Sequence, residues 1–169
     1  GLKSLDNDYD VVCKFDGDII LPTNYFEKLK KIFINNKSVG IAGGNMYILK
    51  RNRWIYENIS SKNHVRGPIK AYRKECFSDI GGLKAHIGWD TLDVLLAKKN
   101  VWEVYTDKNL QVKHLKKTGS NYTFKSKFLQ GTALYCMRFG IILSLLTLIK
   151  SSFNTVDITK LFFGVTGYI

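Results

Sequence analysis

Two aspartates separated by one glycine are the residues of this chain whose types and spacing most directly suggest chemistry. Asp16, Gly17 and Asp18 follow segment 9–15 (YDVVCKF), which has the composition of a strand buried on both faces. In open α/β sheets ligands bind beyond the carboxyl ends of strands, and paired carboxylates suit Mg²⁺ or Mn²⁺ with a diphosphate. The intervening glycine would let a phosphate approach the backbone. An acidic turn is the alternative interpretation, since Asp-Gly is common in turns.

A second acidic segment, 88–93 (GWDTLD), stands where a helix is predicted to begin. Asp90 is either an N-cap or a general base, because a neighbouring tryptophan can desolvate a carboxylate and raise its pKa. Asp93 could act in the same way, but we expect it to face solvent or to cap the turn. His86 precedes this segment and could line the same pocket.

A histidine ends the last predicted strand. His114 is either structural or, if the aspartate pair binds a metal ion, a further ligand through a neutral imidazole nitrogen. His64 has no comparable context. The sequence contains no P-loop, no Gly-x-Gly-x-x-Gly, no His-Glu-x-x-His and no Gly-x-Ser-x-Gly motif.

The elements that must position these residues alternate between strands and helices, which is typical of an α/β fold. Apolar spacing predicts a helix that follows Thr23, a plausible N-cap, and runs to about Asn35. Further strands are predicted at 39–49, 54–59, 65–72, 101–105 and 110–114, and helices at 73–80, 90–99, 122–149 (followed by a break at 151–154) and from 157. The sequence therefore predicts a mixed, mainly parallel sheet flanked by helices.

Composition limits the class of protein. The chain has 169 residues, 45% hydrophobic, with a net charge of +12, so a disordered tail is excluded. The three cysteines are distant from one another, lack metal-ligand spacing and are expected to be reduced, as in a cytosolic protein. The apolar end suggests a piece of a longer protein.

The order and spacing of these motifs resemble the family 2 glycosyltransferases with a GT-A fold. The matching text is YDVVCKFDGDIILPTNYFEKL, KAYRKECFSDIGGL, GWDTLDVLLAKKN and LQVKHLKKTGS, which together cover roughly residues 9–120. The chain departs from the family in having Trp89 before Asp90, where Glu-Asp or Asp-Asp is usual. The family's N-terminal half, with its nucleobase pocket, is missing. No Gln-x-x-Arg-Trp motif is present, which disfavours a processive polymer synthase.

The resemblance implies inverting transfer of a sugar from a UDP- or GDP-sugar to a glycan or lipid-linked acceptor in surface polysaccharide synthesis. It implies that Asp16 and Asp18 bind the divalent ion and diphosphate, with Asp18 the more direct ligand. Asp90 would be the base, and His114 a possible ligand. The alternative is a non-catalytic α/β binding module of the same fold. Asp-to-Asn variants and metal dependence would separate the two.

The C-terminal part is more basic than the rest. Residues 108–169 carry nine basic side chains and one acid, Asp157, around the apolar run 139–149. Eleven residues are too few to cross a bilayer, which needs about 20. Small residues line up at Gly140, Ser144, Thr147 and Ser151, a pattern that fits either close helix packing or the polar side of an interfacial helix.

We therefore predict a partial catalytic domain over 1–120 and a helical extension over 121–169. The extension either covers the sheet as a core helix or lies on an anionic membrane surface, at the inner face of the membrane in the cytoplasm. Nucleic-acid binding has only the net charge in its favour, because no recognition helix or RNA-binding motif is present.

Overall fold

The computed structural model describes residues 8–57, 64–116 and 124–169. The chain divides into two compact units. The first comprises residues 1–83 and 93–117, and the second comprises residues 84–92 and 118–169. The predicted boundary between residues 120 and 121 lies outside the described residues.

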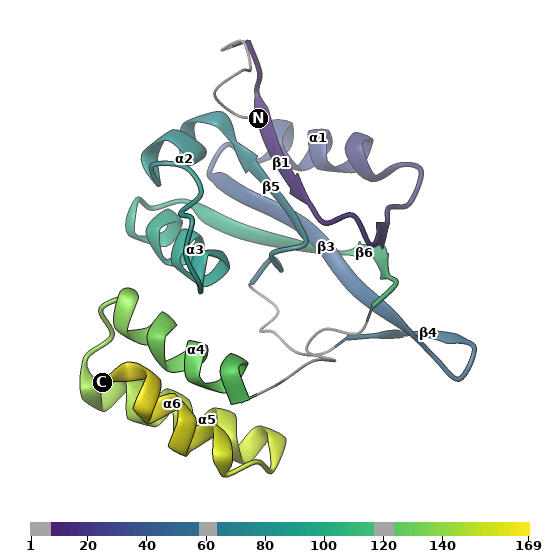
Figure 1. Ribbon diagram of the computed structural model, residues 1–169. Coiled ribbons are helices and arrows are strands. Elements are labelled where there is room, and N and C mark those ends of the chain that lie inside the picture. The colour runs from purple at the N-terminus through teal and green to yellow at the C-terminus, as the bar shows by residue number, and fades with distance from the viewer. Residues whose placement is uncertain (1–7, 58–63, 117–123) are drawn as a thin grey trace. The chain divides into compact units, whose positions relative to one another are not determined.

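One mixed sheet forms the centre of the first unit (Figure 1). Its strand order is β1-β5-β3-β6-β2, and β4 pairs with β3 beyond this path. The strands are β1 (Val11–Phe15), β2 (Ile19–Ile20), β3 (Val39–Lys50), β4 (Arg53–Tyr56), β5 (Ile69–Arg73) and β6 (Glu103–His114).

The prediction of a mainly parallel sheet is wrong for the described residues. Only β3 and β6 pair in parallel, whereas β1–β5, β3–β5, β3–β4 and β2–β6 are antiparallel. The reason is that β5 lies between β1 and β3 and β6 lies between β2 and β3, so neither strand that precedes α1 is a neighbour of the strand that follows it. Strand β1 has one neighbour, β5, among the described strands. It was predicted to be buried on both faces, but Cys13 on this strand is exposed.

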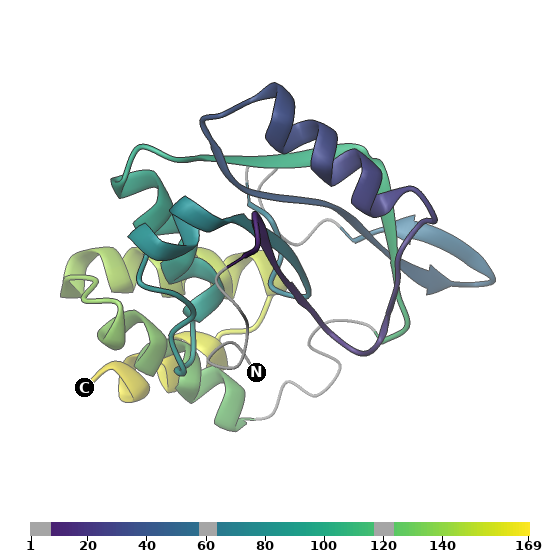
Figure 2. The same cartoon turned by 90° about the horizontal axis from the view of Figure 1, so that it is seen from above.

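The two long strands β3 and β6 run side by side (Figure 2). The sequence predicted two strands within 101–114, but β6 is continuous and accommodates a register shift opposite Gly44 and Asn45. A Cβ atom on Gly44 would lie 2.1 Å from the carbonyl oxygen of Leu110. Glycine is therefore required there by the close approach of β6, and β3 passes through this point unbroken.

Helices cover both faces of this sheet. They are α1 (Tyr25–Asn35), α2 (Lys74–Asp79) and α3 (Trp89–Lys99). Arg73 stacks on Phe33 of α1, whereas the adjacent Tyr72 contacts Phe77 of α2 and Asp93 of α3. Since neighbouring strand residues point to opposite faces, α1 lies on one side and α2 and α3 lie on the other.

The local details of these helices differ partly from prediction. Helix α1 is preceded by Asn24 rather than by the predicted cap Thr23, and no side-chain hydrogen bond caps it.

The three cysteines are free thiols, as predicted. Burial raises the pKa of the Cys76 thiol to about 12, which keeps this group protonated and unreactive.

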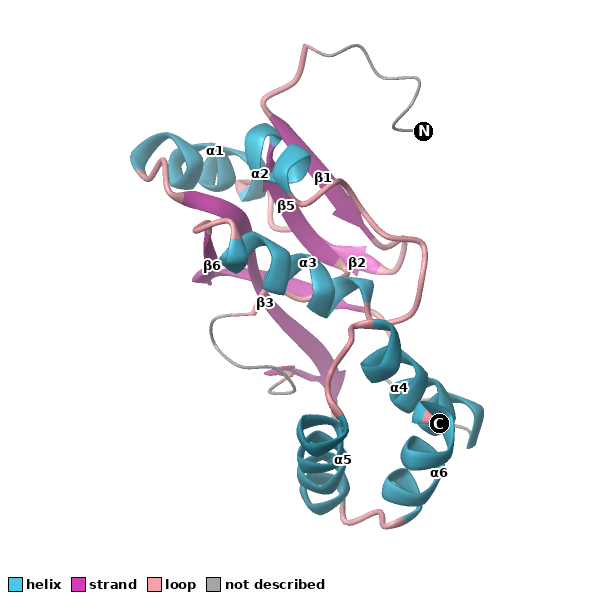
Figure 3. Cartoon of the chain, turned by 90° about the vertical axis from the view of Figure 1, so that its left-hand side faces the viewer, coloured by secondary structure: helices cyan, strands magenta, loops and turns pink. Residues whose placement is uncertain are grey.

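Three helices form most of the second unit (Figure 3): α4 (Phe124–Cys136), α5 (Ile141–Thr155) and α6 (Thr159–Tyr168). The predicted helix over 122–149 is therefore broken at 137–140, and the predicted break at 151–154 is absent. Residues 151–155 continue α5, and in this last turn the Thr155 hydroxyl donates to the Ser151 carbonyl at 2.9 Å.

Close backbone contact joins α4 to α6. A Cβ on Gly131 would lie 1.8 Å from the carbonyl oxygen of Gly164, and one on Gly167 would lie 1.9 Å from that of Phe128. Of the predicted small-residue stripe on α5, Ser144 is buried and Ser151 accepts a hydrogen bond from Gln130 of α4. In the described part of the chain, no helix is both long and apolar enough to span a membrane.

Candidate functional site

Pairing between β2 and β6 brings two of the predicted site residues, Asp18 and His114, close together. Ile19 faces His114 across the antiparallel pair, and the Leu115 N–H donates to the Asp18 carbonyl at 2.9 Å. Asp18 thus precedes one strand, and His114 ends the other. The Asp18 carboxylate oxygen Oδ1 lies 3.6 Å from His114 Nε2, which is longer than a hydrogen bond.

Asp16 has a different environment although it is only two residues away. Its N–H donates to the Pro68 carbonyl at 3.1 Å, which fixes the turn after β1 to the start of β5. Its carboxylate is paired with Lys14 of β1. Of the two aspartates, Asp16 is therefore neutralised by a lysine, whereas Asp18 faces the imidazole.

Gly17 lies in open space. No atom of the described residues comes within 4 Å of where its Cβ would be, and its φ is not positive. Neither packing nor backbone conformation therefore requires glycine at this position. The open space beside Gly17 leaves room for an approaching group, and both the predicted phosphate contact and the acidic turn are compatible with it.

Sequence reasoning missed two further residues: Glu57, which adjoins His114, and Arg66, which pairs with Glu57. Glu57 follows β4, and its N–H donates to the Met46 carbonyl at 2.9 Å. Its carboxylate lies 3.8 Å from His114 Nδ1 and is paired with Arg66. The only available signal was an ionisable residue inside the predicted apolar strand 54–59. We name Asp18, Glu57, Arg66 and His114 the histidine cluster.

The imidazole at the centre of this cluster is buried and incompletely bonded. His114 is only 6% exposed, and its Nδ1 has no hydrogen-bond partner among the described residues. A buried polar atom without a partner carries a free-energy cost of about 1–3 kcal/mol. Such an atom indicates an arrangement that is completed by a ligand or by a small shift of its neighbours.

The predicted base lies in a different unit. Asp90 is in the first turn of α3, as expected, and belongs to the segment 84–92 of the second unit. The carboxylate three residues on, Asp93, belongs to the first unit, where the expectation that it faces solvent is wrong. It is 4% exposed, accepts two hydrogen bonds from Lys70, at 2.6 and 2.9 Å, and accepts one from Tyr72.

Metal binding by the histidine cluster would need ligands beyond the described residues. Among the described residues no group of three or more His, Cys, Asp or Glu side chains could hold a metal ion by itself. Mg²⁺ is, however, commonly held by one or two protein ligands plus phosphates, with bonds of about 2.1 Å. The 3.6 Å between Asp18 and His114 is less than two such bonds. Asp18 and His114 are therefore the side chains of this cluster that would hold such an ion, together with a diphosphate.

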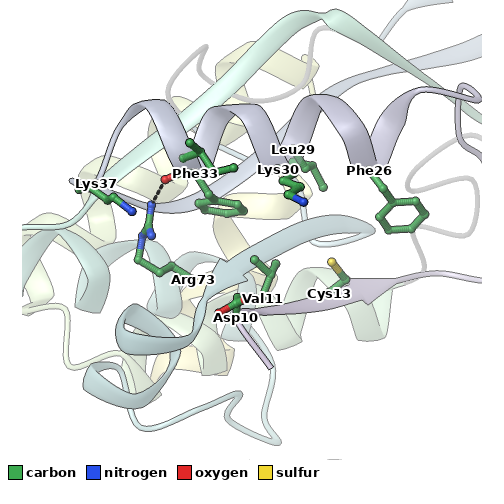
Figure 4. Close-up of a pocket in the computed structure, with 10 residues that line it drawn as sticks. Asp10, Val11, Cys13, Phe26, Leu29, Lys30, Phe33, Lys37 and Arg73 are labelled. Atoms are coloured by element: carbon green, nitrogen blue, oxygen red, sulfur yellow. Dashed lines mark hydrogen bonds between the residues drawn. The ribbon is translucent and has the colours of Figure 1, made fainter. Parts of the chain in front are cut away.

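A groove of about 660 Å³ lies elsewhere on the first unit, between α1 and β1 (Figure 4). Its lining combines apolar side chains such as Phe26 and Leu29 with the cations Lys30, Lys37 and Arg73. None of the site residues predicted from sequence lines this groove. We therefore assign it no part in the chemistry of the histidine cluster.

Comparison with known proteins supports the fold. No protein-family profile and no curated protein sequence matches the chain. Among solved structures the chain is similar to the mannosyltransferase PcManGT from Pyrobaculum calidifontis, whose structure contains GDP-Man and Mn²⁺. The TM-score is 0.52 at 12% identity, over 94% of this chain and 49% of that one. The chain thus has a glycosyltransferase-like fold and spans about half the length of this neighbour.

Proposed function

We propose that this chain is part of a metal-dependent, inverting glycosyltransferase that uses a UDP- or GDP-sugar as donor. The acceptor is a glycan or a lipid-linked sugar in surface polysaccharide synthesis. The observation that carries this proposal is the approach of Asp18 and His114 at adjoining strand ends, beside the open space at Gly17. The similarity in fold to a mannosyltransferase supports the class of reaction.

Each residue has a separate role in the proposed transfer. Asp18 and His114 would hold Mn²⁺ or Mg²⁺, which would offset the charge of the departing diphosphate. Gly17 leaves room for the diphosphate. Asp16, on the same turn, is paired with Lys14. Asp90 accepts the proton of the acceptor hydroxyl.

The transfer forms one bond to the anomeric carbon of the donor sugar and breaks another. The acceptor oxygen forms a bond to the anomeric carbon from the face opposite the diphosphate. The bond from that carbon to the diphosphate breaks, and the electron pair leaves with the nucleoside diphosphate. Attack from the opposite face inverts the configuration at the anomeric carbon.

The helical unit supports a location at an anionic membrane surface. Helix α5 buries the small residues Ser144 and Ser152 and exposes large apolar ones, with Ile142 78% and Phe153 79% exposed. Exposed Lys150 lies on the same helix. An outward apolar face with nearby cations is suited to the interface of a bilayer. We propose peripheral attachment at the cytoplasmic face of the membrane.

Vesicle binding tests this attachment. The protein should bind vesicles that contain anionic lipid, less strongly as salt is raised, and an Ile142→Ser, Phe153→Ser double variant should lose the interaction. Indifference of the wild type to such vesicles at low salt would refute the attachment.

Calorimetric titration of UDP and GDP with and without Mn²⁺ tests the transferase proposal. The full-length protein that contains this chain should bind one of the two nucleotides only with the metal. Asp18→Asn should remove this binding, and Gly17→Ala should weaken it about tenfold without loss of stability. Glu27→Gln, which removes an exposed carboxylate from α1, is the matched control.

The result distinguishes a glycosyltransferase from a non-catalytic binding module of the same fold, the two interpretations that the sequence left open. If the folded protein binds neither nucleotide, the non-catalytic binding module becomes the better interpretation. If Asp18→Asn binds as the wild type does, the metal is held elsewhere.

A further inference from the structure

We propose that Glu57 is a positioning residue that sets the proton and the orientation of the His114 imidazole. This inference deepens the proposed function and rests on it for the identity of the ligand. Glu57 would accept the proton of Nδ1–H, which leaves the lone pair of Nε2 free for the ion. No pattern in the sequence assigns a role to Glu57.

The geometry places the imidazole between two carboxylates. Nε2 lies 3.6 Å from Asp18, and Nδ1 lies 3.8 Å from Glu57. The second distance is too long for a hydrogen bond, and a shift of about 1 Å would form one. Because Nδ1 is buried without a partner among the described residues, a move toward Glu57 would satisfy it.

The surroundings of Glu57 hold its carboxylate in place. The side chain is 3% exposed, and its backbone N–H is bonded to β3 at the Met46 carbonyl. Arg66, 12% exposed, pairs with the same carboxylate oxygen that faces Nδ1. A carboxylate in such an ion pair can only accept hydrogen bonds.

The chemistry of a histidine ligand explains why such a partner matters. A neutral imidazole carries one proton, so it can ligate through Nε2 only when that proton is on Nδ1. Ligating histidines usually donate the other N–H to a carboxylate or carbonyl, and loss of that partner typically weakens metal binding about 10–100-fold. Without Glu57 the two tautomers of His114 would compete.

The decisive measurement is the tautomer of His114 in the metal-free protein, from ¹⁵N chemical shifts of the imidazole at about pH 8. A His114→Gln variant identifies the signal among the three histidines of the chain. The wild type should hold the proton on Nδ1, and Glu57→Gln should shift the population toward Nε2–H. A wild type with the proton on Nε2 would overturn the proposal, whether or not the variant folds.

Metal titration supplies the second readout. Glu57→Gln should bind Mn²⁺ with nucleotide about 10–100-fold more weakly than the wild type. Glu75→Gln, which removes an exposed carboxylate from α2, should bind as the wild type does. Equal affinity in Glu57→Gln and wild type would refute the positioning role and leave the transferase proposal standing. A wild type without metal binding would instead refute the transferase proposal, and the tautomer would still decide the role of Glu57.

Discussion

Two clusters of buried polar side chains in the first unit differ in how completely their groups are hydrogen-bonded. Lys70, Tyr72 and Asp93 form a buried network in which both carboxylate oxygens have donors at 2.5–2.9 Å. In the histidine cluster, the imidazole is also buried, but its two nitrogens lie 3.6 and 3.8 Å from their facing carboxylates. Among the described residues the first network is complete, whereas in the second the Nδ1 atom of His114 has no hydrogen-bond partner.

This difference is the one expected between a structural role and the proposed ligand-binding role. Lys70 projects from β5 and Asp93 from α3, so their pair fastens a helix to the sheet. A buried ion pair of this kind survives only if its hydrogen bonds are complete. The histidine cluster tolerates long contacts, which fits a site whose last partner comes from solution. Burial of a polar group is therefore a poorer guide to function than a hydrogen bond that the group lacks.

Removing the lysine of the complete network should have the largest effect on stability. Lys70→Met leaves the 4% exposed carboxylate of Asp93 without a counter-charge. We expect a loss of about 3–5 kcal/mol in the free energy of unfolding, measured by urea denaturation. Adding Asp93→Leu should recover much of this loss, because the uncompensated charge is then removed as well.

A matched control for this prediction is the lysine of a solvent-exposed pair. Lys14 and Asp16 have side chains that are 29% and 38% exposed. Lys14→Met should change the free energy of unfolding by no more than about 1 kcal/mol. Similar losses in Lys70→Met and Lys14→Met would remove the basis of the comparison between the two clusters.

Local patterns in the sequence predicted much of the candidate site. The aspartate pair after a strand, the helix that begins at the Trp89-Asp90 step and the strand that ends at His114 are all present. Each depends on a few adjacent residues whose apolar spacing and turn chemistry are visible in the sequence. The approach of Asp18 to His114 was also anticipated, since both were placed at strand ends.

The partners of these residues could not be predicted in the same way. Glu57 meets His114 across 57 residues of sequence, through a β3–β4 hairpin and the parallel β3–β6 pair. Asp93 is buried because Lys70 on β5 reaches it, although its position near the start of a helix suggested a solvent-facing cap. Both contacts depend on strand order, which the alternation of strands and helices does not determine.

A third ion pair, in the helical unit, extends the comparison to an exposed but well-bonded carboxylate. Asp157 precedes α6 and is held by Lys127 of α4 at 2.8 Å and by Thr159 at 2.6 Å. These hydrogen bonds, that from Lys127 foremost, lower the pKa of Asp157 from 3.8 to about 2.

The lowered pKa of Asp157 makes the stability of the helical unit fall as pH falls. We expect this effect to be the smallest of those predicted. A carboxyl whose pKa is lower in the folded state stabilises the fold above its unfolded pKa of 3.8 and loses that contribution as pH falls toward about 2. Amide hydrogen exchange in α4 and α6 should therefore accelerate over this interval. Asp157→Asn should exchange faster at neutral pH and change less between about pH 4 and 2, because no ionisation remains to be lost. Equal pH dependence in wild type and variant would show that the Lys127 pair does not hold α6 to α4, and that complete hydrogen bonding stabilises a carboxylate only where water is excluded.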